Sequence, residues 1–142
     1  MPIEDYKTIA LDTMLFIYYF EAKHHFTPKI EQLLKKIEGG GIKGVTTVIT
    51  LSEILVKPLT EGNIELADEY KNIINSFPNL YVLEINQQLA VLGANLKAKY
   101  NIKLPDALQM AGGLFGGAQA FVTNDKKLLK IEEIKVLTLD QL

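Results

Sequence analysis

Residues 120–129, AFVTNDKKLL, join an apolar run to a segment of lysine and leucine through Thr123, Asn124 and Asp125. The apolar run is typical of a buried β-strand, and the segment after it indicates a short helix. Asp125 can cap that helix through its side-chain oxygen, or it can take part in chemistry at the end of the strand. Both interpretations require that the strand ends at this polar triplet.

The same change from strand to helix recurs along the chain. Thr27 and Pro28 predict a helix start of the N-cap and N1 kind, Pro58 predicts a helix end, and Asn86 predicts a cap. Strands are predicted in KTIALDT (7–13), GVTTVI (44–49), LYVLEI (80–85), AFVT (120–123) and KVLTL (135–139). Helices are predicted in MLFIYYFEAK (14–23), KIEQLLKKIE (29–38), TLSEILVK (50–57), 64–74, 87–100 and PDALQMAGGLFGG (105–117).

Strands that alternate with helices predict an α/β fold, with a parallel sheet covered by helices on both faces. The length of 142 residues is that of a single domain, expected to span residues 1–142. In open sheets of this kind the functional site lies beyond the carboxyl ends of the strands. Functional residues are therefore sought at strand ends and at the starts of the helices that follow.

Composition excludes several classes of site. The chain has no cysteine and only two histidines, so disulfides, thiolate chemistry and a histidine zinc site are not expected, and any metal would need oxygen ligands. All 15 basic residues are lysines, so a guanidinium clamp on phosphate or carboxylate must come from a partner. The apolar stretch 9–20 is too short to span a bilayer, and residues 1–7 lack a basic leader, so a cytoplasmic protein is expected.

Four acidic residues stand at predicted strand ends or helix starts: Asp12, Glu53, Asp106 and Asp125. Each has an ordinary structural explanation as well. Asp12 and Asp125 suit helix caps, Asp106 beside Pro105 suits the positive end of a helix dipole, and Thr50 with Glu53 matches a capping box. Their joint placement on one edge of the sheet favours a common site.

Clustered carboxylates repel one another unless protons are retained or a cation is bound. Oxygen ligands with open coordination positions suit Mg²⁺ or Mn²⁺. Such an ion can activate water and stabilise charge on a phosphodiester. The residues themselves therefore predict a metal-dependent phosphodiesterase.

The segments LDTMLFIYYFEA, TTVITLSEIL, LPDALQMA, FVTNDKKLLKI and VLTLDQL together resemble the PIN domain, the small ribonuclease fold of VapC-type toxins. The resemblance runs from about residue 8 to the end of the sequence, and it is carried by the order and spacing of the segments. It implies a three-layer α/β/α sandwich with a five-stranded parallel sheet. It also implies an endoribonuclease that uses Mg²⁺ or Mn²⁺, a small antitoxin partner and a homodimer.

By this resemblance, the acidic positions of the metal site are Asp12, Glu53, Asp106 and Asp125. Asp125 would hold the ion directly or through water, or position the attacking water. Thr123 falls on the hydroxyl position that helps to orient Asp125, and Thr13 is expected to support the site in the same way. Lys126 and Lys127 are candidates for contact with the RNA backbone, although a solvated helix face also explains them.

Met14 departs from the family pattern, because a small polar residue often stands two positions after the first acid. This leaves two alternatives to the toxin open: a non-catalytic module that binds RNA or protein, and a solitary RNA-processing nuclease. The rings of Phe16, Tyr18, Tyr19 and Phe20 are expected mainly in the core or in dimer packing, although the family often uses this region to bind an antitoxin peptide. His24 and His25 are assigned no role.

Overall fold

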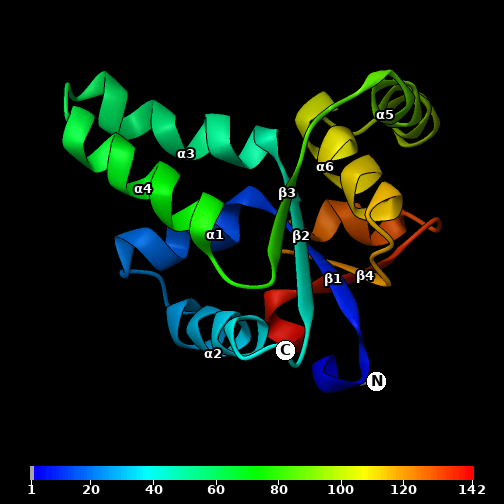
Figure 1. The fold of residues 1–142 in the computed structure, drawn as a ribbon. Coiled ribbons are helices and arrows are strands. Elements are labelled where there is room, and N and C mark those ends of the chain that lie inside the picture. Colours follow the sequence, from blue (N-terminus) through cyan, green and yellow to red (C-terminus); the bar gives the residue numbers. More distant parts are fainter. Residues whose placement is uncertain (1) are drawn as a thin grey trace.

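Five strands form one sheet in the order β3-β2-β1-β4-β5, with every neighbouring pair parallel (Figure 1). The structure is a computed structural model and describes residues 2–142. The strands are β1 (Thr8–Leu11), β2 (Lys43–Thr47), β3 (Leu80–Leu83), β4 (Ala120–Thr123) and β5 (Lys135–Thr138). The sheet confirms the predicted parallel α/β fold.

Between residues 2 and 142 the chain forms six α-helices. They are α1 (Thr13–Glu21), α2 (Thr27–Glu38), α3 (Val48–Thr60), α4 (Ile64–Ser76), α5 (Gln87–Tyr100) and α6 (Leu104–Phe115). Three short 3₁₀ helices are η1 (Ile3–Asp5), η2 (Lys126–Lys130) and η3 (Leu139–Gln141). Within residues 2–142, no helix has the length and apolar character needed to cross a membrane.

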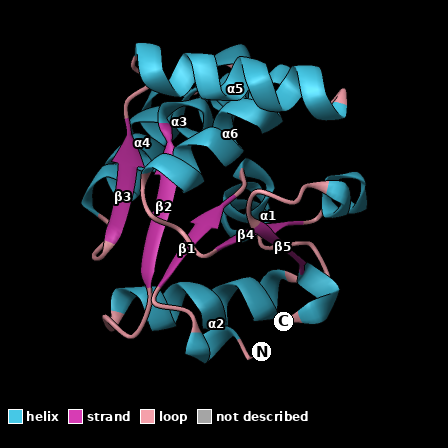
Figure 2. Cartoon of the chain, turned by 90° about the vertical axis from the view of Figure 1, so that its right-hand side faces the viewer, coloured by secondary structure: helices cyan, strands magenta, loops and turns pink. Residues whose placement is uncertain are grey.

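The core has two layers because side chains alternate between the faces of each strand. On β1, Ile9 and Leu11 join the layer built with α1 and α2, whereas Ala10 joins the layer built with α5 and α6. Figure 2 shows α2 on one side of the sheet and α5 with α6 on the other. α3 and α4 form a helical pair that extends away from the sheet (Figure 1).

The glycines of α6 let this helix lie very close to the sheet. A Cβ atom on Gly113 would lie 2.7 Å from the Cβ of Ala10 in β1, and one on Gly112 would lie 2.2 Å from Cγ2 of Thr47 in β2. These separations are well below van der Waals contact. The close approach brings the first turns of α6 to the carboxyl ends of β1 and β2.

Several predicted element boundaries are wrong, and each has a local cause. Pro58 does not end α3, because it lies in the last turn, where a missing N–H costs the helix a single hydrogen bond. The predicted strand 44–49 ends at Thr47, whose side chain caps α3 by accepting from the N–H of Ile49 (3.1 Å). Thr27 is the first residue of α2 and donates its hydroxyl proton to the carbonyl of Tyr18, so it is not the cap.

Candidate metal centre

The four predicted acids all lie near the carboxyl edge of the sheet, on both sides of the point where the strand order reverses. Asp12 follows β1 and caps α1, and Asp125 follows the neighbouring strand β4 and caps η2. Asp106 lies in the first turn of α6, and Glu53 lies within α3, after β2. In parallel sheets this is where ligands bind, because helix starts and strand ends meet there.

Asp12 is the most buried of these acids, with 7% of its surface exposed. Its Oδ1 accepts from the N–H of Thr13 (2.8 Å), and its Oδ2 accepts from the hydroxyl of Thr123 (2.7 Å). Burial raises the pKa of Asp12 to about 6 against these two hydrogen bonds, and the negative charges of Asp106 and Glu53 add to the rise. The fold thus holds Asp12 in place while it raises the free energy of the charged carboxylate.

Asp106 and Asp125 lie close enough to repel each other. Burial raises the pKa of Asp106, the charges of Asp125 and Glu53 raise it further, and the nearby Lys103 lowers it. Asp125 also accepts from the N–H of Lys127 (3.0 Å), so it caps η2 and lies beside Asp106 at the same time.

Thr123 links the ends of β1 and β4. The sequence predicts that it orients Asp125, and its oxygen does accept from the backbone N–H of Asp125 (3.1 Å). Its own proton, however, goes to the carboxylate of Asp12. Thr123 therefore fixes two acids at once, one through each side of its hydroxyl group.

Glu53 is held by Thr13, whose hydroxyl donates to Oε1 of Glu53 over 2.7 Å. The capping box predicted for Thr50 and Glu53 is wrong, because Thr50 lies inside α3 and its hydroxyl lies 3.0 Å from that of Thr13. Sequence reasoning also missed Gln109, a buried side chain that donates to Thr13 (2.9 Å). The available signal was a polar residue three positions after Asp106, on the same face of an otherwise apolar helix.

The donor set suits a divalent cation. Within residues 2–142 no three acidic or histidine side chains converge as a finished metal cage, so an ion would have to draw the carboxylates inward. Burial is the main cause of the raised pKa of Asp12 and of Asp106, and the charges of the neighbouring acids add to it, so a bound cation would favour the charged form of both. Four oxygen-donating acids with this excess charge match the preferences of Mg²⁺ and Mn²⁺.

A lysine-lined pocket of about 200 Å³ opens beside Asp106 and Asp125. Its lysines are Lys103, Lys127 and Lys130. Lys126 does not line this pocket and lies 3.5 Å from the carboxylate of Asp140. Of the two lysines proposed from the sequence, Lys127 thus has the better position for a phosphate near the acids.

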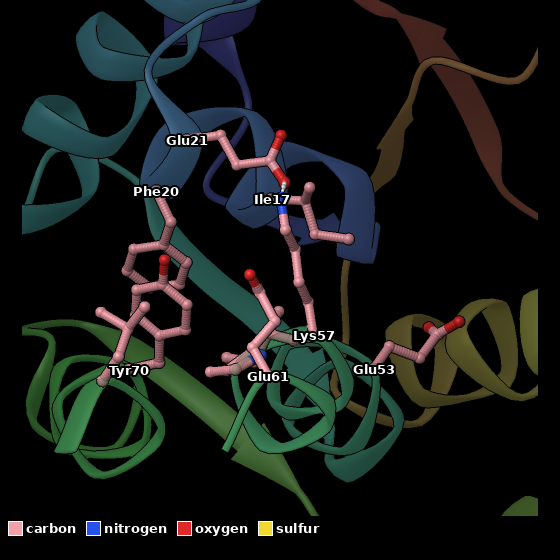
Figure 3. A pocket seen from close by; sticks show the side chains of 10 residues that line it. Ile17, Phe20, Glu21, Glu53, Lys57, Glu61 and Tyr70 are labelled. Carbon is pink, nitrogen blue, oxygen red and sulfur yellow. Dashed lines mark hydrogen bonds and ion pairs between the residues drawn. The ribbon is translucent and has the colours of Figure 1, made fainter. Parts of the chain in front are cut away.

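A larger groove of about 350 Å³ lies between α1, α3 and α4. This α1–α4 groove is lined by Ile17, Phe20, Glu21, Glu53, Ile54, Lys57, Pro58, Glu61, Leu66 and Tyr70. Figure 3 shows Phe20 over Tyr70, with ring centroids 4.2 Å apart, and Glu53 at the edge of the groove, pointing away from them. The groove therefore begins on apolar and aromatic side chains and leads to the acidic site.

Comparison with known proteins gives a consistent result for the fold. The PIN domain family model matches residues 9–134. VapBC2 from Rickettsia felis, solved with a promoter DNA fragment, superposes with a TM-score of 0.73 at 15% identity, over 92% of this chain and 98% of that chain. A toxin–antitoxin complex from Klebsiella pneumoniae gives 0.71 at 19% identity, over 94% of this chain and 99% of that chain.

VapC20 from Mycobacterium tuberculosis, a toxin that cleaves the sarcin-ricin loop, gives a TM-score of 0.67 at 14% identity, over 89% of this chain and 98% of that chain. No curated protein sequence matches this chain. The family model covers most of the sequence. The chain belongs to the PIN domain family.

Proposed function

We propose that this protein is a metal-dependent endoribonuclease, the toxin of a toxin–antitoxin pair. The observation that carries the proposal is the group of four acids at the carboxyl edge of the sheet, with the pKa of Asp12 and Asp106 raised by burial and mutual repulsion. Membership of the PIN domain family and the likeness in fold to VapBC proteins support it. Asp12, Glu53, Asp106 and Asp125 would hold Mg²⁺ or Mn²⁺.

The ion would supply charge stabilisation for the phosphodiester and a water of lowered pKa. The chain's own residues do the positioning. Thr123 and Thr13 fix the carboxylates of Asp12 and Glu53 through hydrogen bonds of 2.7 Å each. Asp125 lines the same pocket as Asp106 and would accept a proton from a water there, while the lysines of that pocket would bind phosphate oxygens.

The direct test is cleavage of end-labelled RNAs, transfer RNAs and ribosomal RNA fragments included, by purified protein free of any antitoxin. Each RNA is incubated with Mn²⁺, with Mg²⁺ or with a chelator. Cuts that require metal support the nuclease. Metal binding without a cut in any RNA would favour the non-catalytic binding module instead.

The lysine-lined pocket gives a separate prediction about RNA binding. Replacing Lys103, Lys127 and Lys130 by glutamine should weaken single-stranded RNA binding and reduce the slope of log affinity against log salt by about 2, because each phosphate contact contributes about 0.7 to that slope. Fluorescence anisotropy with Mn²⁺ present measures both quantities, in an Asp12→Asn background that is expected not to cleave.

The matched control replaces Lys23, Lys35 and Lys71 by glutamine, three exposed lysines outside the pocket. It changes the net charge by the same amount, so it should leave most of the slope in place. Equal losses in the two triple variants would show that only overall charge matters and that the pocket does not receive phosphate.

The α1–α4 groove is the proposed binding site for the antitoxin. Its lining combines apolar residues with the carboxylates of Glu21, Glu53 and Glu61, and Lys57, the lysine among its lining residues, is 3.4 Å from Glu21. A peptide with an apolar face and an arginine would complement both features, and this chain has no arginine of its own to offer. Such a peptide would reach the acidic site along the groove.

Leu66→Glu should weaken antitoxin binding about thirtyfold or more, because a charge in an apolar contact of this kind costs about 2 kcal/mol or more. RNA cleavage by the free variant should stay near the wild-type rate. Ile64→Glu is the control, since Ile64 lies on the same helix and is 65% exposed outside the groove. Calorimetry with a synthetic amphipathic peptide that carries an arginine measures binding, and equal effects of the two changes would contradict this binding site.

A further inference from the structure

Gln109 is a buried carboxamide at the centre of the site, with 2% of its surface exposed. Its Oε1 accepts from the hydroxyl of Thr47 (2.5 Å). Its Nε2 donates to the hydroxyls of Thr13 (2.9 Å) and Thr50 (2.6 Å). Gln109 on α6 therefore ties together the ends of β1 and β2 and the starts of α1 and α3, and its carbonyl and both of its N–H protons have partners.

The direction of the Gln109 amide follows from Thr47. The oxygen of Thr47 accepts from the N–H of Ile49, as the cap of α3 (3.1 Å). The hydroxyl proton of Thr47 is then free to point at Gln109, which sets the carbonyl of the amide on that side. The two N–H protons of Gln109 consequently face Thr13 and Thr50.

This direction decides where the proton of Thr13 goes. The oxygen of Thr13 accepts from Gln109, and its proton is given to Oε1 of Glu53. The proton of Thr50 has Thr46 at 2.8 Å as its acceptor, because Thr46 donates its own proton to the main chain of β1 (3.1 Å). Every hydroxyl is thus used once as a donor: the branch through Thr13 ends on the carboxylate of Glu53, and the branch through Thr50 and Thr46 ends on the carbonyl of Leu11.

We infer that Gln109 is a positioning residue for Glu53, acting through Thr13. Without the N–H of Gln109, the hydroxyl of Thr13 can turn toward Thr50, only 3.0 Å away, and release Glu53. Glu53 is an exposed side chain on the surface of α3, so a released carboxylate regains several rotamers. The inference rests on the proposed function, because it assigns Glu53 to the metal.

The test is a double-mutant cycle on Mn²⁺ binding by calorimetry, which needs no RNA and no turnover. Gln109→Met keeps the volume and removes the hydrogen bonds, and it should weaken Mn²⁺ binding about tenfold, the usual effect of losing a partner that orients a metal ligand. Glu53→Gln should weaken binding by at least as much. The double variant should bind no more weakly than Glu53→Gln alone.

Ile30→Ala provides the control for general destabilisation. Ile30 is buried on the opposite face of the sheet, and its truncation should cost stability without changing the Mn²⁺ affinity. If Gln109→Met does not fold, Gln109→Glu serves instead, because its carboxylate accepts the protons of the same hydroxyls and draws that of Thr13 away from Glu53. This variant should also lose about tenfold in affinity.

Losses that add up in the double variant would overturn the inference, since Gln109 would then act independently of Glu53. Unchanged affinity in both Gln109 variants would overturn it as well. No Mn²⁺ binding by the wild-type protein would overturn the proposed function itself and this inference with it.

Discussion

Asp106→Asn is expected to abolish metal-dependent RNA cleavage and to leave thermal unfolding in metal-free buffer unchanged or slightly improved. The loss of activity should exceed about 100-fold, because even the partners that merely orient metal ligands contribute about 10–100-fold. Stability should survive, since burial and the charges of Asp125 and Glu53 all raise the pKa of Asp106. Removing its charge relieves this repulsion and offsets the lost interaction with the helix dipole, which is worth about 0.3–1 kcal/mol.

Cleavage of end-labelled RNA and thermal melts followed by circular dichroism measure the two effects on the same preparation. Asp68→Asn is the matched control, because Asp68 is an exposed acid on α4, away from the strand ends, and its replacement should preserve full activity. A large loss of metal-free stability in Asp106→Asn, with cleavage retained, would instead make this acid a structural residue of the α6 start.

The sheet and the acids could be predicted because both depend on local sequence. AFVT is buried throughout and ends at Thr123, where the polar triplet begins, and Asn86 caps α5 as its position before an apolar helix predicts. Asp12 and Asp125 were ambiguous between cap and site, and both do cap a helix. One carboxylate oxygen of Asp12 caps the helix while the other accepts from Thr123.

The parts that could not be predicted depend on distant contacts. Thr50 and Glu53 have the spacing of a capping box, but Thr47 takes that role, and Thr50 is needed by Gln109, which is 59 positions away in sequence. No local pattern distinguishes these uses of a threonine. Local sequence also does not predict which lysines lie near the acids. Lys103 lies near them from the loop before α6, whereas Lys126 pairs with Asp140.

The stability of the metal-free protein should also depend strongly on pH. In metal-free buffer the free energy of unfolding should rise by about 1.3 kcal/mol when the pH falls from 7 to 5, a little under half of the roughly 3 kcal/mol that Asp12 contributes by about pH 3. The pKa of Asp12 is raised from 3.8 to about 6 in the folded protein, so between these values the folded state holds a proton that the unfolded state has released. Proton uptake therefore favours folding, and the raised pKa of Asp106 acts in the same direction.

Urea unfolding at pH 7 and pH 5, with and without Mn²⁺, measures this linkage. The carboxyls whose pKa is lowered, Glu4, Glu133 and Asp140, oppose the effect only nearer their ordinary values of 4.5 and 3.8 or below, so they leave this window largely undisturbed. Asp12→Asn keeps an oxygen for the N–H of Thr13 and should lose most of the pH dependence.

Saturating Mn²⁺ should stabilise the protein more at pH 7 than at pH 5, because the ion competes with the proton for the same carboxylates. A stability that falls between pH 7 and pH 5 in the wild type, or the same rise in Asp12→Asn, would show that the Asp12 carboxyl does not carry the excess charge of the site.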